Sequence, residues 1–358
     1  MTIKSLLIGS AAALVAVSGA RAADAVVTAE PEPAEYVKIC DVYGAGYFYI
    51  PGTETCLRIG GYLRYDAGFG DVITKDGSQA IDHLDGGIND TWTKNARFAL
   101  RTWTGQETEL GTLKTYTETR FNFGNSPTSP TAVNKAVTLN FAWVQLGGLR
   151  IGKDESVFDS FVGYAGSVIQ DTLVPYGTKD TNLISYYFDG GNGFSAVVSL
   201  EEGSGAYTID SYVPHVVAGL KYKQGWGSIA AVGAYDSNYE EWVGKARLDV
   251  KATDQLSLFI MGGYGSDDNA AYNFYKIWDG NWAVWGGGTY KINEKTAFNA
   301  QVSYDEGKKL AVAANVAYEI VSGFTITTEV DYVSVDASPF HAVNDDGVGG
   351  IVRFQRNF

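Results

Sequence analysis

Two groups of charged side chains with opposite sign stand apart in this sequence and could act on ions in solution. The acidic group lies within residues 155–181 and consists of Glu155, Asp159, Asp171 and Asp180. The basic group precedes it and consists of Arg58, Arg64, Arg97, Arg101, Lys114 and Arg120, and we expect Asp66 and Glu118 to offset part of its charge. A basic surface facing an acidic one across water creates a field that discriminates between charged solutes. Alternatively, each basic side chain is neutralised by a neighbouring acidic one. Which of the two holds depends on the strands and loops that carry these residues.

The other polar residues give little support to catalysis. A Ser–His–acid site needs a histidine beside its serine, whereas His83, His215 and His341 are scattered and no G-x-S-x-G occurs. The stretch "GGLRIGKD" (147–154) has the G-x4-G-K spacing of a phosphate loop, but Asp154 stands where Ser or Thr must hold magnesium. It also falls at a short turn between two expected strands, with no helix after it. We therefore expect no enzymatic activity, no cofactor and no metal site.

The N-terminus predicts export. Lys4 is followed by an apolar run from Leu6 to Val17 and by the small-x-small sequence Ala20-Arg21-Ala22. This is the pattern of a cleaved secretory signal peptide, here residues 1–22. A membrane anchor is the alternative, but a spanning helix needs roughly 20 apolar residues. Residues 23–55 then form an acidic leader that carries prolines and Cys40 and is expected in the periplasm.

The two cysteines, Cys40 and Cys56, are the only ones in the chain. In an exported chain an even pair predicts one disulfide, because the compartment is oxidising. Closing this loop would stabilise the fold by on the order of 3 kcal/mol. A metal site is the alternative, and it lacks further ligands because the three histidines are far away in the sequence.

The negative net charge of the chain argues against a nucleic-acid partner. With 27 Lys and Arg against 41 Asp and Glu, the formal charge is −14. Nucleic-acid binding depends on neutralising phosphates with basic residues, so we expect no nucleic-acid partner.

Beyond Cys56 the polarity alternates with period two. In "LKTYTETRF" (113–121), Leu113, Thr117 and Phe121 fall on one face while Lys114 and Arg120 fall on the other. Successive side chains of a strand point to opposite faces, so each such segment is a strand with one apolar and one polar side. Sixteen candidate strands begin near residues 56, 91, 109, 136, 148, 182, 193, 214, 226, 240, 254, 281, 295, 308, 323 and 347.

Three features favour a membrane barrel over a multi-domain β-sandwich adhesin. The strands are about 10–14 residues long, against about 5–6 in soluble proteins. Aromatic residues recur near their ends, as the girdles of outer-membrane barrels require: Tyr62, Tyr65, Trp103, Tyr222, Tyr264, Tyr290, Tyr304 and Tyr332. Short turns alternate with longer loops, among them 67–90, 124–135, 155–181, 202–213, 266–280 and 337–346. We predict an all-β, sixteen-stranded antiparallel transmembrane barrel over residues 56–358.

A sixteen-stranded barrel leaves an aqueous lumen that a loop can narrow. The loop at about 155–181 is too apolar for a solvated crown, so we expect it to fold inward as the constriction, opposite the basic wall. The ending "GGIVRFQRNF" reads as the closing strand, because a sheet in lipid must leave no unpaired edge. Phe358 would face the lipid, and Arg356 would face outward near the membrane edge.

Three stretches resemble one known family. "VKICDVYGAGYFYIPGTETCLRIGGYLRYD" (37–66), "FVGYAGSVIQDTLVPYG" (161–177) and "GGIVRFQRNF" (349–358) are similar to the alphaproteobacterial (type-2) porins of rhizobial and related outer membranes. The resemblance implies a homotrimeric outer-membrane porin for passive diffusion of small hydrophilic solutes, with the loop at 155–181 in the channel. The terminal Phe358 resembles the signal read by the barrel assembly machinery. Pore-lining charges vary within the family, so ion selectivity does not follow from the resemblance.

The alternative function is a substrate-selective outer-membrane channel. It would need a binding track or a plug, and residues 23–55 are too few to fill this lumen. The partners expected are outer-membrane lipid, lipopolysaccharide and two further copies of the chain.

Overall fold

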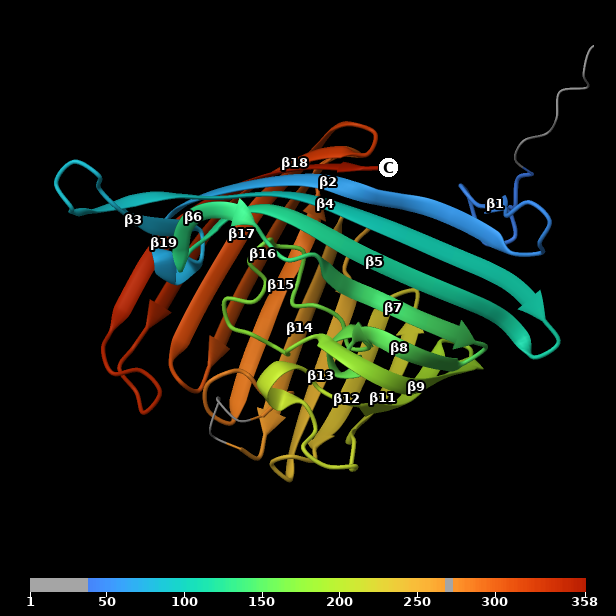
Figure 1. Ribbon diagram of the computed structural model, residues 1–358. Coiled ribbons are helices and arrows are strands. Elements are labelled where there is room, and N and C mark those ends of the chain that lie inside the picture. Colours follow the sequence, from blue (N-terminus) through green and yellow to red (C-terminus); the bar gives the residue numbers. More distant parts are fainter. Residues whose placement is uncertain (1–37, 268–272) are drawn as a thin grey trace, which may run out of the picture. The chain divides into compact units, whose positions relative to one another are not determined.

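Antiparallel strands make up most of the chain in the computed structural model, which describes residues 38–267 and 273–358 (Figure 1). The predicted signal peptide and residues 23–37 of the leader lie outside the described residues. Nineteen strands belong to one sheet, and β1 (Phe48–Tyr49), β3 (Gly77–Ile81) and β6 (Ser129–Asn134) are short additions to it. The remaining sixteen confirm the predicted strand number.

The sixteen long strands follow one another in the order of the chain. The first eight are β2 (Cys56–Gly70), β4 (Ile88–Thr108), β5 (Gly111–Ser126), β7 (Thr138–Leu146), β8 (Leu149–Glu155), β9 (Asp180–Gly191), β10 (Phe194–Glu201) and β11 (His215–Gln224). The second eight are β12 (Gly227–Asp236), β13 (Glu241–Lys251), β14 (Leu256–Gly265), β15 (Trp282–Lys291), β16 (Thr296–Asp305), β17 (Lys309–Val321), β18 (Phe324–Val335) and β19 (Asp345–Asn357). The described helices are single turns: η1 (Val72–Thr74), α2 (Val157–Ser160) and η2 (Gly205–Tyr207).

The last strand closes the sheet, as predicted. β19 pairs with β2 from Gly349 opposite Gly70 to Asn357 opposite Tyr62. The terminal residue continues the ladder, because Phe358 and Gly61 exchange two backbone hydrogen bonds of 3.1 Å. Backbone groups in lipid must find partners within the protein. The pairing of β19 with β2 therefore removes the edge that the sheet would otherwise expose.

Alternate residues of each strand lie on opposite sides of the barrel wall. On β14 to β16 the outward side chains Ile260, Val284 and Val302 are exposed, while the intervening Met261 and Trp285 are buried. The same alternation at the end of the chain leaves Phe358 exposed and turns Arg353 toward Asp66 on β2. In the described parts of the chain no helix is long and apolar enough to cross a membrane.

Some details differ from the sequence-based expectation. The strands range from 7 residues in β8 to 21 in β4, a wider spread than expected. Within the loops predicted at 67–90 and 124–135, β2 and β5 continue and β3 and β6 add short hairpin strands. Tyr62 and Trp103, expected among the girdle aromatics, instead share the side of the arginines. Each stands at an even spacing from an inward arginine, so period two turns it inward as well.

The leader is tied to the start of the barrel. Cys40 and Cys56 form the predicted disulfide. Nearby, β1 pairs with β2 through Phe48 and Leu57, and the Tyr43 hydroxyl donates to Glu107 on β4 at 2.9 Å. Burial and this contact raise the pKa of Tyr43 to about 12.

Candidate pore constriction

The loop between β8 and β9 begins with a capped helical turn. The Ser156 hydroxyl accepts a hydrogen bond from the Phe158 amide at 3.1 Å, as an N-cap residue does. The same hydroxyl donates to Glu201 on β10 at 2.7 Å, and the Val157 amide donates to the other Glu201 oxygen at 2.9 Å. Glu201 thus holds the start of the loop against the wall.

The apolar residues of this loop pack against the wall side chains that alternate with the outward-facing ones. The buried loop members are Val157, Phe158, Phe161, Val162, Ala165, Leu173, Val174 and Tyr176. Their wall partners in the same core include Val217, Val232, Val243, Phe259, Met261 and Trp285. These partners stand on β11 to β15, and Leu183 of β9, Val197 of β10, Ala311 of β17 and Val333 of β18 belong to the same core. The loop therefore lies along the wall from β9 to β18.

Polar side chains of the wall bind the loop at successive points. The Lys245 ammonium on β13 pairs with Asp159 at 2.6 Å and donates to the Tyr176 carbonyl at 2.7 Å. The Trp285 indole on β15 donates to the Val174 carbonyl at 2.9 Å. Both members of the Lys245–Asp159 pair are buried, so neither charge is stabilised by bulk water.

The tip of the loop is held by β18. Glu329 accepts from the amides of Ile169 and Gln170 at 2.5 and 2.7 Å, and Asn315 on β17 donates to it at 2.7 Å. The Gln170 side chain donates to Asp76 at 2.8 Å. Burial raises the pKa of Asp76, which lies between η1 and β3.

The four predicted loop acids have different surroundings. Asp159 pairs with Lys245 as described, and Asp180, the first residue of β9, pairs with Lys153 at 3.0 Å. Glu155, the last residue of β8, accepts from the Tyr164 hydroxyl. Asp171 accepts from the Tyr176 hydroxyl at 2.5 Å, and burial raises its pKa. Two of the four negative charges are therefore neutralised by lysines that the sequence reasoning did not select.

The predicted basic residues divide into paired and unpaired members. Arg101 and Arg120 both contact Glu118 at 2.5 Å, so one carboxylate is shared between two arginines and offsets one of their two charges. Asp66, expected to offset the wall charge, instead pairs with Arg353 on β19 at 2.8 Å. Lys114 is exposed near the short-turn end of β5.

Three arginines of the wall have neutral partners. Arg64 donates to Gln355 at 2.7 Å, and Arg97 donates to Asn122 at 2.8 Å. Arg58 lies over the Trp103 ring, 4.6 Å from its centroid. Within the described residues no carboxylate oxygen lies within 4 Å of these three guanidinium groups, which leaves their charges available to solutes.

The residues that bind the loop were missed by the sequence reasoning. Glu201, Lys245 and Glu329 are polar residues of long strands, and the period-two pattern of the sequence predicts that they point inward. Their contacts with residues 156–171 could not be predicted from the sequence. The partners are 45 to 160 residues apart in the chain, and only the closure of the sheet brings them together.

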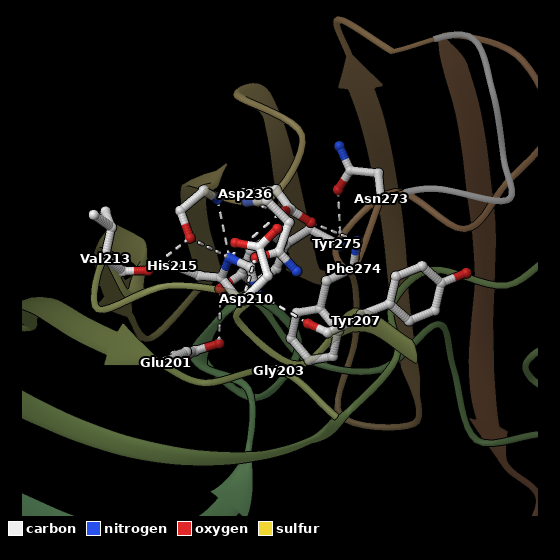
Figure 2. Close-up of polar contacts among 12 residues, drawn as sticks. Glu201, Gly203, Tyr207, Asp210, Val213, His215, Asp236, Asn273, Phe274 and Tyr275 are labelled. Atoms are coloured by element: carbon white, nitrogen blue, oxygen red, sulfur yellow. Dashed lines mark hydrogen bonds and ion pairs between the residues drawn. The ribbon is translucent and has the colours of Figure 1, made fainter. Parts of the chain in front are cut away.

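His215 is the histidine that most resembles part of a catalytic site. Its Nδ1 lies 3.4 Å from Asp236 and 3.2 Å from the Ser237 hydroxyl (Figure 2). A triad needs serine and acid on opposite ring nitrogens, whereas both lie at Nδ1 here and Nε2 is directed to the Tyr207 carbonyl at 3.2 Å. The imidazole is fully buried, and the Phe274 amide donates to Asp236 at 2.8 Å. The cluster therefore links the loop after β10, through Tyr207, to the loop after β14, through Phe274. Its geometry is not that of a serine nucleophile with its base.

The stretch at 147–154, rejected as a phosphate loop from its sequence, lies at a turn between two strands. Gly147 and Gly148 form the turn between β7 and β8, and Arg150 and Lys153 follow within a strand. A strand–turn–strand unit offers no helix N-terminus to a phosphate.

Comparison with known protein families and proteins identifies porins as relatives of this chain. A family model described as a porin subfamily matches residues 24–351. Porin Omp2b of Brucella suis biovar 1 is 54% identical over 379 aligned residues, covering 100% of both chains, and porin Omp2b of Brucella melitensis biotype 1 is 53% identical with the same coverage.

Solved structures show the same fold at low sequence identity. The outer-membrane channel DcaP of Acinetobacter baumannii is 19% identical with a TM-score of 0.61, covering 87% of this chain and 99% of that one. OmpF of Salmonella typhi is 11% identical with a TM-score of 0.57, covering 85% and 98%. The anion-selective porin of Comamonas acidovorans is 14% identical with a TM-score of 0.53, covering 85% and 100%.

The closed sixteen-stranded barrel and its polar interior define an outer-membrane channel protein. The chain belongs to the porin family, in the alphaproteobacterial branch represented by the Brucella porins. It forms a passive porin channel across the outer membrane.

Proposed function

We propose that the narrowest part of the pore lies between the loop at 155–181 and the basic wall of β2, β4 and β5. The observation that carries this proposal is the attachment of most of the loop to one part of the wall, with only its tip also held beside β3, where Asp76 and Lys75 contact Gln170 and Thr172. Its other polar and apolar anchors lie on β9 to β18, while Arg58, Arg64 and Arg97 stand on β2 and β4. In the closed sheet β9 to β17 lie away from β2 and β4, and β18 is separated from β2 by β19. A solute in the lumen then passes between them.

The constriction prefers anions although the whole chain is acidic. Asp159 and Asp180 are neutralised by lysines, and the nearest contacts of Glu155 and Asp171 are tyrosine hydroxyls. Arg58, Arg64 and Arg97 have neutral partners and keep their positive charge. Local charge at the narrowest section has more influence on selectivity than the net charge of the chain.

The protein acts as a homotrimer without enzymatic activity, cofactor or metal, with residues 1–22 as signal peptide and 23–55 as a periplasmic leader. Outer-membrane lipid and lipopolysaccharide surround the barrel. Phe358 serves the barrel assembly machinery as a terminal signal. Its ring is exposed and stacks on Phe98 with centroids 6.4 Å apart, which supports a position at the lipid-facing rim.

Planar-bilayer recording of the folded protein tests this proposal. We expect stable ohmic conductance in three equal steps, with a reversal potential in a salt gradient that indicates anion preference. Conductance only in the presence of one particular solute would favour a substrate-selective channel instead. Cation preference would contradict the assignment of the free arginines to the constriction.

A further inference from the structure

The outer surface of the barrel has an apolar groove of about 710 Å³ over β14, β15 and β16. Gly286 and Gly288 of β15 and Ala300 of β16 form its floor. The walls come from the strands on either side, with Leu258 and Ile260 on one and Phe298 and Val302 on the other. Ile260 and Val302 are at least half exposed, which places the groove on the face directed away from the lumen.

The strand register explains why the surface is hollow at this place. Gly286 lies between its register partners Ile260 and Val302, and Gly288 lies between Leu258 and Ala300. The middle strand therefore contributes no side chain between two rows of aliphatic ones. Toward the short turns, Leu256 and Tyr290 border the groove.

Aromatic residues mark this face as one that contacts lipid. Exposed Tyr264 and Trp282 stand at the long-loop end of β14 and β15, and exposed Tyr290 and Phe298 stand at the short-turn end. Aromatic girdles of this kind lie at the two interfaces of a lipid-exposed barrel surface. A face buried against another subunit would not need both girdles, so lipid is the medium that fills the groove.

The geometry points to a binding site for one acyl chain of a phospholipid from the periplasmic leaflet. The groove runs from Ile260 toward Leu256 and Tyr290, that is, toward the short turns, which face the periplasm in such barrels. Its lining carries no charged residue, and its volume is within the range of about 300–1,000 Å³ typical of ligand sites. A flexible hydrocarbon chain restores the dispersion contacts that an unfilled hollow forfeits.

Gln301 is the polar side chain of the lining, and it does not oppose this ligand. It stands at an inward position of β16, where its side chain donates to the Asp171 carbonyl at 3.1 Å. It therefore contributes backbone and stem to the groove while its amide remains on the lumen side.

A pair of glycine substitutions tests the site. At Gly286 an added Cβ meets only the Phe259 carbonyl oxygen at 3.7 Å, so Gly286→Leu fills the groove without a backbone clash. Gly262 is an outward glycine of β14 outside the groove, with nothing within 4 Å of an added Cβ, so Gly262→Leu is the matched control. Gel electrophoresis of unheated samples separates the folded protein from the unfolded chain. A variant that fails to fold is identified by the absence of the folded band.

The probe is phosphatidylethanolamine with a photoreactive acyl chain, present in vesicles that contain the folded protein. We expect cross-links on β14 to β16 in the wild type and in Gly262→Leu, and at least a fivefold loss of them in Gly286→Leu. Equal labelling of all three proteins would overturn the site. Loss of the trimer in Gly286→Leu with unchanged labelling would show a subunit interface instead. Cross-linking by lipopolysaccharide but not by the phospholipid would overturn the assignment to the periplasmic leaflet.

Should Gly286→Leu fail to fold, Ile260→Ala and Val302→Ala provide a second test. Each lowers one wall of the groove and leaves the backbone unchanged. We expect both to reduce cross-linking at least twofold, and unchanged cross-linking in both would contradict the proposal.

Discussion

Lys245 and Asp159 form a buried ion pair of 2.6 Å that joins the barrel wall to the loop at 155–181 across 86 residues of sequence. The lysine also donates to the Tyr176 carbonyl, so one ammonium binds the loop at both its beginning and its end. Because water does not reach the pair, removing one partner leaves the other charge buried and unpaired.

Replacing Lys245 by Met is therefore expected to loosen the loop. Loss of one member of a buried pair destabilises by about 3–5 kcal/mol, and we expect noisier single-channel currents together with a lower midpoint of urea unfolding. The double variant Lys245→Met with Asp159→Asn removes both charges and should recover most of the stability. If the double variant is as unstable as the single one, the stability does not depend on the pairing.

Arg97→Gln is expected to shift the reversal potential in a salt gradient toward cations. Its guanidinium contacts Asn122 and not a carboxylate, so the substitution removes a free charge. The control replaces Arg101 and Glu118 by glutamine together, which removes a bridged pair without changing net charge. An equal shift in both variants would mean that the position of Arg97 has no special effect on permeating ions.

Loop attachment is expected to weaken as pH rises from about 4. Burial raises the pKa values of Asp76 and Asp171 above the ordinary value of about 3.9. Each group binds its proton more tightly with the loop in place, so this stabilisation is complete below the ordinary pKa and disappears as pH passes through the raised one.

The temperature at which the folded band is lost on gels, followed from pH 4 to pH 8, measures this effect. Asp171→Asn should flatten the dependence because the asparagine does not ionise. A wild-type protein whose transition temperature rises steadily over this range would contradict the predicted sign.

Reduction of the Cys40–Cys56 disulfide is expected to destabilise by about 3 kcal/mol without opening the barrel. The ladder between β2 and β19 does not involve either cysteine, so closure remains. Urea unfolding with and without reductant measures the difference, and Cys40→Ser should reproduce the reduced state. Loss of conductance on reduction would show that the leader contributes to the pore.

The strands could be predicted because their signal is local. Lipid on one side of the wall and water on the other impose period two, and closure needs only that the last strand reach the first. Side-chain partners were harder to predict. Asp66 was expected to offset the basic wall, but the pairing of β19 with β2 places Arg353 opposite it at 2.8 Å. No local pattern shows that 287 residues of chain return to this point.

The sequence by itself determined the sixteen strands, the closing role of "GGIVRFQRNF" and the apolar character of the loop at 155–181. Each of these follows from the order of polar and apolar residues within a few positions. Only the tertiary structure decided which charges remain free. Lys245 and Lys153 neutralise loop acids, Glu118 is shared by two arginines and offsets one of their charges, and, within the part of the chain that the structure describes, Arg58, Arg64 and Arg97 have no acid within ion-pair distance. The reason is that Coulomb attraction depends on distance in space, and strand pairing around the closed barrel sets those distances.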